Sequence, residues 1–393
     1  MATETNAAEV QPCSQAGLSG HVQVLDGVRG IAILMVLVVH FYQREVINSS
    51  YPLLGKFLGR ALAPGGYGVE LFFVLSGLLI TGILLDTKAK PGFFGKFYMR
   101  RILRIFPLYY GALAIIFGVL PHFLAFDAGG REIAAHQVWL WTYLANWPSS
   151  YIWDNSNQFL LGHFWSLSVE EHFYMVWPAL VFFCSRSTLW KLCWGILGIG
   201  IVTRAAVGWG GASAPVFLQW PTLTKVDGLA VGAMLAIALR DPTFGGWLPA
   251  GRLLSRGLGG AFALFLALAL VPRTLHSVLV ATLGETVIVF FFGLFVLRAL
   301  RSLPGEATHR ILRSGFLVAF GKYSYGIYVI HGILRPALAG WFPLDRVPAK
   351  WGLPIILHGF YYLYAVGVSF GLAYLSYHLF EKRFLSLKRH FEY

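Results

Sequence analysis

The feature that most constrains the fold is an apolar stretch from Leu25 to Tyr42, which is long enough to cross a lipid bilayer. It carries Arg29 near its start and His40 near its end. On an α-helix, residues at this separation turn by about 1100°, which leaves them about 20° out of phase and about 16 Å apart along the axis. The two side chains therefore share one stripe, and an ionisable residue at membrane depth indicates a functional site.

The rest of the chain is similarly apolar. Of its 393 residues, 57% are hydrophobic and 12% are charged, whereas soluble domains carry about 25% charged residues. We therefore predict an all-α fold, a polytopic membrane helical bundle with about ten transmembrane helices and no large soluble domain. The predicted spans cover residues 26–45, 68–86, 106–126, 164–184, 190–209, 222–240, 257–272, 277–298, 315–340 and 353–379.

The basic residues predict how this bundle is oriented. Lys and Arg cluster at 88–104, 186–191, 240–256, 298–313 and 382–389. With ten spans and both termini cytoplasmic, every cluster falls on the cytoplasmic side, as the positive-inside rule requires. A full span over the Trp-rich residues 136–147 would move the later clusters outside, so we predict a short interfacial or re-entrant element there. We expect 1–24 to be a flexible cytoplasmic tail, 25–385 the integral membrane domain and 386–393 a cytoplasmic tail.

Composition also argues against several function classes. The net charge of +13 is explained by the basic cytoplasmic loops, and we find no nucleic-acid-binding signature. The cysteines Cys13, Cys184 and Cys193 form no metal-binding pattern, so we expect no metal site. The chain also lacks the GxSxG, P-loop and HExxH motifs of common soluble enzymes.

Two segments carry polar residues at the ends of predicted spans. In HFWSLSVEEHFY, Ser166 and Glu170 are i,i+4 neighbours and share a helix face. An acidic pair at a helix N-terminus is the alternative interpretation, because the helix dipole favours negative charge there. In RRILRIFPLYY, Arg100, Arg101 and Arg104 form either a lipid-anchoring cluster or a cradle for a polyanion, since Arg forks suit phosphate.

Three further segments place polar groups inside the bundle. GVELFFVLSG contains Glu70, and TKVDGLAVGA contains Asp227, which we expect to pair with Lys225. GKYSYGIYVIH places Ser324, Tyr328 and His331 on one stripe of one helix. For each segment the alternative is a structural role in helix packing.

Together these blocks resemble the membrane-bound acyltransferase-3 family, the bacterial O-acetyltransferases that modify surface glycans. The resemblance covers roughly residues 24–385. It rests on the Arg29–His40 pair, GVELFFVLSG, RRILRIFPLYY, FWSLSVEEHFY, DGLAVGA and SYGIYVIH in this order. It implies about ten spans and transfer of an acyl group from acyl-CoA, by default acetyl-CoA, to a hydroxyl of a glycan or small molecule. It also implies an integral protein of the bacterial cytoplasmic membrane, in contact with lipid.

Some family members carry an SGNH esterase-like domain after the bundle. The sequence to Tyr393 contains no such segment, so we expect donor and acceptor to meet within the bundle. Carried over by position, the family's Arg–His motif matches Arg29 and His40, and its serine–glutamate block matches Ser166 and Glu170. Its arginine block matches Arg100, Arg101 and Arg104, and its late histidine matches His331.

We expect His40 to act as a general base on the acceptor hydroxyl, with Glu170 orienting the imidazole and Ser166 orienting that carboxylate or the substrate. Arg29, Arg100, Arg101 and Arg104 would hold the nucleotide end of acyl-CoA. A covalent acyl-enzyme on His40 or Ser166 is the alternative mechanism. A transporter or a non-catalytic membrane scaffold is the alternative function, and an antibiotic or lipid-linked sugar is the alternative acceptor.

Overall fold

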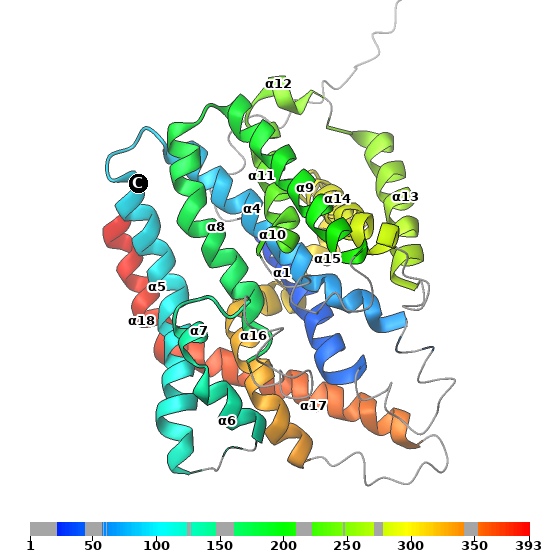
Figure 1. Cartoon of the computed structure of the whole chain (residues 1–393). Coiled ribbons are helices and arrows are strands. Elements are labelled where there is room, and N and C mark those ends of the chain that lie inside the picture. The colour runs from blue at the N-terminus through cyan, green and yellow to red at the C-terminus, as the bar shows by residue number, and fades with distance from the viewer. Residues whose placement is uncertain are drawn as a thin grey trace, which may run out of the picture.

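The computed structural model describes residues 22–43, 57, 59, 61–123, 126, 128–146, 161–209, 222–246, 248–270, 278–341 and 353–393. These residues form helices and no strand (Figure 1). The predicted N-terminal tail, residues 1–24, falls almost wholly outside the described residues. The long helices are α1 (Gln23–Leu37), α4 (Gly68–Thr87), α5 (Phe93–Ala114), α8 (Phe164–Phe183), α9 (Arg186–Trp209), α11 (Asp227–Ala238), α13 (Gly251–Leu270), α14 (Val278–Leu300), α16 (Gly315–Trp341) and α17 (Leu353–Ser376).

Shorter helices complete the described part of the chain. They are α6 (Ala128–Ala135), α7 (Val138–Trp141), α10 (Thr222–Lys225), α12 (Pro242–Gly245), α15 (Ala307–Leu312) and α18 (Lys382–Ser386). Wide π turns lie at η1 (Val38–Gln43), η3 (Ile115–Val119) and η10 (Tyr377–Glu381). Tight 3-10 turns lie at η2 (Ala63–Tyr67), η4 (Leu120–His122) and η11 (Leu387–Phe391).

Six described helical segments are long and apolar enough to cross a membrane: Gln23–Phe41, Pro64–Thr87, Phe93–His122, Arg186–Ala206, Thr282–Leu300 and Leu357–Phe391. The other predicted spans correspond to α8, α11, α13 and α16, which are all helical. Of these, α11 is a short apolar helix, and α8 carries Glu170 and Glu171. The all-α membrane bundle is therefore confirmed, while ten spans and cytoplasmic termini stay predictions.

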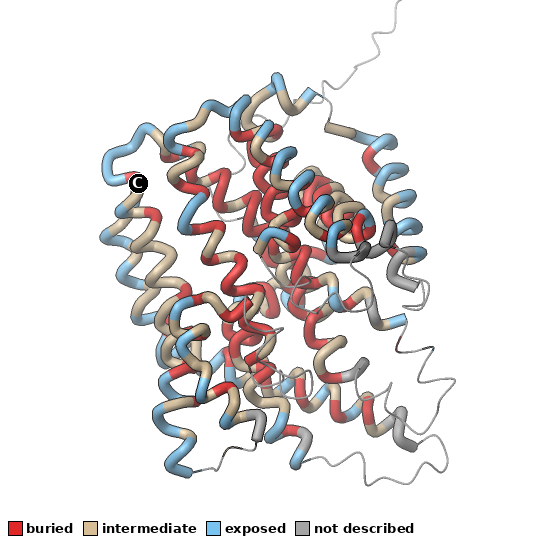
Figure 2. Tube along the Cα trace, viewed as in Figure 1, coloured by how far each residue is buried: buried red, intermediate tan, exposed pale blue. Residues whose placement is uncertain are grey.

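The centre of the bundle is built on close contacts between helix backbones. A Cβ on Gly30 of α1 would lie 2.1 Å from the carbonyl oxygen of Leu317 in α16, and one on Gly77 of α4 would lie 2.1 Å from that of Leu229 in α11. Small residues permit this approach, which maximises van der Waals contact where no hydrophobic force drives helices together. Buried positions accordingly concentrate in α4, α11 and α16, while α13 and α17 present more exposed ones (Figure 2).

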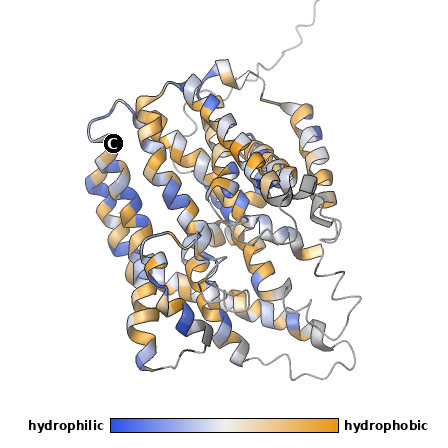
Figure 3. Cartoon of the chain, viewed as in Figure 1, coloured by the Kyte–Doolittle hydropathy of each residue, from blue (hydrophilic) through white to orange (hydrophobic). Residues whose placement is uncertain are grey.

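One predicted boundary is wrong. The third span was placed at 106–126, but α5 begins at Phe93. The three arginines at 100, 101 and 104 therefore lie on the helix and not in the loop before it. Figure 3 shows hydrophilic positions on α5 where it runs beside the C-terminal helices. A hydropathy window misses this start, because the Lys and Arg residues of the first turns mask the apolar face that buries Phe93 and Phe97.

The described part of the Trp-rich stretch forms the short helix α7, which packs on α5. Tyr109 donates a hydrogen bond to the carbonyl of Leu140 at 2.7 Å, and Tyr110 donates one to that of Trp141 at 3.1 Å. Tyr143 adopts a left-handed backbone conformation, with φ of 56°, and stacks on Tyr109 with ring centroids 4.1 Å apart. The described part of this stretch is thus short, as predicted, and is anchored by aromatic side chains.

Candidate active site

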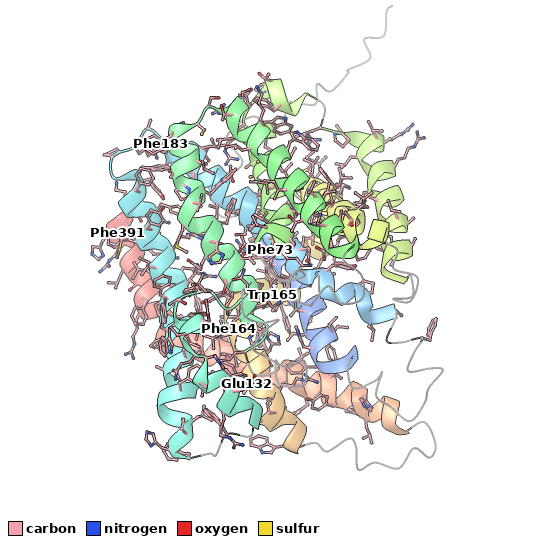
Figure 4. All side chains as sticks on the ribbon, viewed as in Figure 1. Phe73, Glu132, Phe164, Trp165, Phe183 and Phe391 are labelled. Atoms are coloured by element: carbon pink, nitrogen blue, oxygen red, sulfur yellow. The ribbon has the colours of Figure 1, made fainter. Side chains whose placement is uncertain are left out.

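A cavity of about 260 Å³ lies inside the bundle, between α1, α4, α5, α8 and α16. Many of the polar residues singled out in the sequence line it: Arg29, Arg101, Arg104, Ser166, Glu170, Ser324 and Tyr328. The remaining wall is mostly apolar and includes Phe73, which packs edge to face on Trp165 with ring centroids 6.2 Å apart (Figure 4). A mainly apolar cavity with a few convergent polar groups is typical of a binding site for a small molecule.

The basic side chains come from two helices, α1 and α5. Arg29 forms an ion pair with Asp26 at 2.8 Å, and its side chain keeps 32% of its surface exposed. Arg101 and Arg104 lie one turn apart on α5 and both reach the cavity. The Nε of Arg101 is buried, and none of the described residues accepts a hydrogen bond from it. A buried unpaired donor is costly, so an acceptor supplied by a ligand would stabilise this arrangement.

The acidic side chains lie across the cavity on α8. Glu170 lies beside the hydroxyls of Ser76 and Tyr174, and it interacts electrostatically with Arg101 and Arg29. Those two hydroxyls are themselves hydrogen-bonded at 2.5 Å. This differs from the expectation that Glu170 orients the His40 imidazole: the structure places Glu170 with the arginines. Attraction to this carboxylate favours keeping both guanidinium groups on this side of the cavity.

Ser166 and Tyr328 form another polar wall of the cavity. Their hydroxyl oxygens are 2.5 Å apart, and both lie within hydrogen-bonding distance of the carbonyl oxygen of His163, at 3.1 Å and 3.0 Å. Both side chains are buried. Ser166 is therefore held by Tyr328 and a backbone carbonyl, a role that the sequence did not indicate.

Three histidines meet behind this wall: His331 of α16, His163 directly before α8, and His40 of the π turn η1. The Nε2 of His331 is 3.3 Å from the Nδ1 of His40, and the rings of His331 and His163 lie 4.7 Å apart. Tyr328 lines the cavity on one side, while its ring lies 5.6 Å from that of His331. His40 and His331 thus lie next to the cavity, with Tyr328 between.

The contacts of the ring nitrogens indicate the tautomers of His331 and His40. The Nδ1 of His331 is 2.7 Å from the carbonyl oxygen of Tyr328, and the Nδ1 of His40 is 3.0 Å from that of Val36. Carbonyl oxygens only accept hydrogen bonds, so each Nδ1 carries the proton and each Nε2 has the lone pair. His40 therefore has its Nδ1–H near the lone pair of His331 and its own basic nitrogen at Nε2. The π turn at η1 sets this orientation, and such turns are frequent at functional sites.

The other predicted site residues lie away from the cavity lining. Arg100 contacts the C-terminal segment, with its Nη1 3.4 Å from the carbonyl oxygen of Phe391. Glu70 pairs with Lys225 at 3.4 Å, and Lys225 also pairs with Glu285. Asp227 pairs with Arg204 at 2.7 Å. The expected Lys225–Asp227 pair is thus wrong, because each residue has a partner on a different helix.

Sequence reasoning missed His163, Arg204 and the hydroxyl pair Ser76–Tyr174. His163 begins a segment that the sequence had singled out, but its position just before α8 gave no helical stripe to place it on. The sequence signal that could have identified it is a histidine directly before the start of an apolar helix. Among the described residues, no cluster of three or more His, Cys, Asp or Glu side chains is arranged to hold a metal ion.

A bundle of apolar, membrane-length helices around a charged internal cavity defines an integral membrane protein with a buried binding site. The chain belongs to the acyltransferase-3 family, whose profile, described as an acyltransferase domain, matches residues 22–374. It is therefore an integral bacterial membrane protein of this family, and the resemblance inferred from the sequence blocks is confirmed.

The relatives found among characterised proteins are bacterial. The chain is 26% identical to the peptidoglycan O-acetyltransferase OatA of Listeria monocytogenes, covering 79% of this chain and 49% of that protein. It is 27% identical to the putative peptidoglycan O-acetyltransferase YrhL of Bacillus subtilis, and the match covers 92% of this chain and 54% of that protein. It is 26% identical to the O-acetyltransferase OatA of Staphylococcus aureus, and the match covers 82% of this chain and 52% of that protein. The chain thus spans about half the length of these relatives. No solved structure matches it.

Proposed function

We propose that this protein transfers an acetyl group from cytoplasmic acetyl-CoA to a hydroxyl of a cell-wall glycan of the peptidoglycan type. The observation that carries the proposal is one cavity lined by three arginines and by the Ser166–Tyr328 wall, with His40 and His331 behind that wall. The named functions of the relatives support the glycan acceptor.

The arginines suit the phosphates of the donor. Guanidinium groups bind phosphate through paired N–H donors, and they stay charged in a buried site. Arg29, Arg101 and Arg104 reach the cavity, and Arg101 has a buried donor to offer. We place the nucleotide end of acetyl-CoA at these side chains, with the acyl arm extending along the apolar wall toward Ser166 and Tyr328.

His40 is the proposed general base. Its Nε2 removes the proton of the acceptor hydroxyl as that oxygen attacks the thioester carbonyl carbon. A C–O bond forms, the C–S bond breaks, and the CoA thiolate takes up the proton from the imidazolium. His331 stabilises the imidazolium by accepting from its Nδ1–H across the 3.3 Å contact, as the third member of a catalytic triad does. Tyr328 has to move aside for the thioester to reach His40.

Glu170 has a different proposed role from the one expected. Because it lies with Ser76, Tyr174, Arg101 and Arg29, it positions the phosphate-binding arginines and does not act on the imidazole. Its loss should raise the KM for acetyl-CoA more than it lowers kcat. Loss of His40 should do the reverse, so the two variants separate the donor end of the site from the chemical end.

The direct test uses purified protein, acetyl-CoA and soluble peptidoglycan fragments. His40→Ala should lower kcat by about 10²–10⁴-fold, the usual contribution of a general base, while CoA binding is retained. The matched control is His122→Ala, because His122 lies exposed at the end of the α5 segment. Near-normal turnover by His40→Ala would show that the mechanism is wrong.

The same purified protein distinguishes the alternative functions, mechanisms and acceptors. A transporter moves label across vesicles without consuming thioester, whereas an acyltransferase releases free CoA in step with ester formation. If the acyl group passes through His40 or Ser166, labelled acetyl-CoA without acceptor leaves an isolable protein adduct. Offering an antibiotic or a lipid-linked sugar in place of the glycan tests the acceptor.

A further inference from the structure

Glu171 of α8 is a buried carboxylate that the proposed reaction does not use. Only 7% of its surface is exposed. The cavity lining includes Leu167, Glu170, Glu171 and Tyr174, and residues at this spacing form one stripe along a helix. The stripe lies toward the Phe164 end of α8, which is labelled in Figure 4. Glu171 therefore belongs to the face of α8 that is turned to the cavity.

One oxygen of this carboxylate lacks a hydrogen-bond partner among the described residues. The Oε1 of Glu171 is buried, and no described side chain or backbone group donates to it. The Nε of Arg101, which lines the same cavity, is buried and lacks a described acceptor. The two atoms therefore do not bond to each other, although one accepts and the other donates. Because unpaired buried polar groups are costly, a ligand that supplies one donor and one acceptor would stabilise both.

A secondary amide supplies this combination, because its N–H donates and its carbonyl oxygen accepts. The pantetheine arm of CoA contains secondary amides, and the first of them follows shortly after the phosphates. A guanidinium group carries several N–H donors, so Arg101 can bind a phosphate through its terminal nitrogens and an amide oxygen through Nε. Apolar residues of the cavity lining, among them Leu75, Leu79 and Ile80, suit the methyl and methylene groups of the arm.

We propose that Glu171 and Arg101 together bind an amide of the pantetheine arm. The carboxylate of Glu171 accepts a hydrogen bond from the amide N–H, and the Nε of Arg101 donates one to the amide oxygen. The inference rests on the proposed function and specifies how the cavity holds the arm of the donor. Glu171 is thus a binding residue, whereas Glu170 positions the arginines. An arm held at one amide presents its thioester at a fixed reach, which favours reaction by restricting its orientation.

The first test is calorimetric binding of two ligands, CoA and adenosine 3′,5′-bisphosphate, to the purified full chain. Glu171→Met keeps a side chain of similar length but removes the acceptor. It should weaken CoA binding at least about tenfold, the loss expected for one hydrogen bond to a charged group. Binding of the bisphosphate, which lacks the arm, should be unchanged. Glu171→Gln retains an acceptor oxygen and should recover part of the CoA affinity. Equal weakening for both ligands would overturn the assignment.

The matched control is Tyr143→Phe. The hydroxyl of Tyr143 is also buried and without a partner among the described residues, but Tyr143 is not part of the cavity lining. Its removal should leave the affinity for CoA unchanged. If Tyr143→Phe and Glu171→Met weakened CoA binding equally, the loss would not come from a contact with the arm, and the inference would be wrong.

The second test is thermal unfolding of the ligand-free protein, which separates a binding role of Glu171 from a structural one. Removing a buried carboxylate oxygen that lacks a partner takes away an unfavourable contribution. Glu171→Met should therefore unfold at the wild-type Tm or above it. A lower Tm together with weaker binding of both ligands would show that Glu171 supports the fold and does not bind the arm.

Failure of the proposed function is recognisable separately. In that case neither wild-type protein nor any variant binds CoA or consumes acetyl-CoA. If the wild-type protein does both while Glu171→Met binds CoA as wild type does, the proposed function stands and the inference about Glu171 fails.

Discussion

At the scale of the residue, the chemistry proposed for His40 depends on His331. The Nδ1 of His331 bonds to backbone carbonyls of its own helix, so its Nε2 lone pair points at the Nδ1 of His40. A neutral imidazole fixed in this way orients the second ring and stabilises its charged form. The ring of His163 lies 4.7 Å from that of His331 and packs against it.

Substitution His331→Phe should lower kcat about 10- to 100-fold, the usual cost of losing a residue that orients a functional imidazole. The KM for acetyl-CoA should stay unchanged, because the arginines are untouched. His331→Gln retains an acceptor and should recover part of the rate. A purely structural role would instead lower the thermal stability of both variants and give no difference in rate between them.

A substitution at Gly332 tests how tightly the ring of His163 is packed. A Cβ at this position would lie 2.3 Å from the Cε1 of His163, so Gly332→Ala must displace the ring. We expect a stability loss of about 1–3 kcal/mol, as for overpacking of a core, together with lower kcat. Gly340→Ala on the same helix is the control, because nothing lies within 4 Å of its added Cβ. Thermal unfolding and kcat of the two variants provide the comparison.

The sequence predicted which side chains lie close together better than it predicted their individual partners. Arg29, Arg101, Arg104, Ser166, Glu170, Ser324 and Tyr328 do line one cavity. Glu170 was assigned to His40, but it lies with Ser76 and Tyr174. Periodicity places side chains on a face of one helix, whereas partners depend on how separate helices cross. Nothing local in the sequence relates Ser76 to Tyr174.

At the scale of the element, a buried charge network joins α9, α11 and α14. Arg204 donates to both carboxylate oxygens of Asp227, at 3.1 Å and 2.7 Å, and also to the carbonyl oxygens of Thr282 and Thr224. Thr286 donates to Asp227 at 2.8 Å. Lys225 and Asp227 are two residues apart and do not face each other on a helix. This explains why the pairing predicted from proximity in sequence did not form.

Asp227→Asn should destabilise the protein by about 3–5 kcal/mol, because it leaves the Arg204 guanidinium buried without its counter-charge. The control is Asp86→Asn, which breaks the bidentate pair with Arg240 at 2.7 Å and 2.8 Å. Because 46% of the Asp86 side chain is exposed, its loss should cost no more than about 1 kcal/mol. Similar melting temperatures for the two variants in detergent would contradict a structural role for the network.

At the scale of the whole molecule, the orientation of the bundle decides which compartment supplies each substrate. The predicted topology places the region around Arg301 in the cytoplasm and residues 127–163 outside. Membrane-length helices were predicted well, because apolar runs are a direct signal. The sequence signal for a membrane span is weaker in the charged helix α8 and the short helix α11, because their hydropathy reflects contact with other helices as much as with lipid.

Alkaline phosphatase fused after Arg301 should be inactive, and the same fusion after Arg131 should be active, because this reporter folds only outside the cytoplasm. The two positions lie on opposite sides in the ten-span topology and serve as controls for each other. Activity after Arg301 would require an odd number of spans before it and would reverse the assignment of the basic loops.

The wall formed by Ser166 and Tyr328 has a consequence for the order of events in the proposed reaction. The two hydroxyls are 2.5 Å apart and bound to the same carbonyl oxygen, and Tyr328 lies between the cavity and the ring of His331. A donor held in the cavity would reach the histidines only after this hydrogen-bonded pair has opened, so opening of the pair would precede acyl transfer.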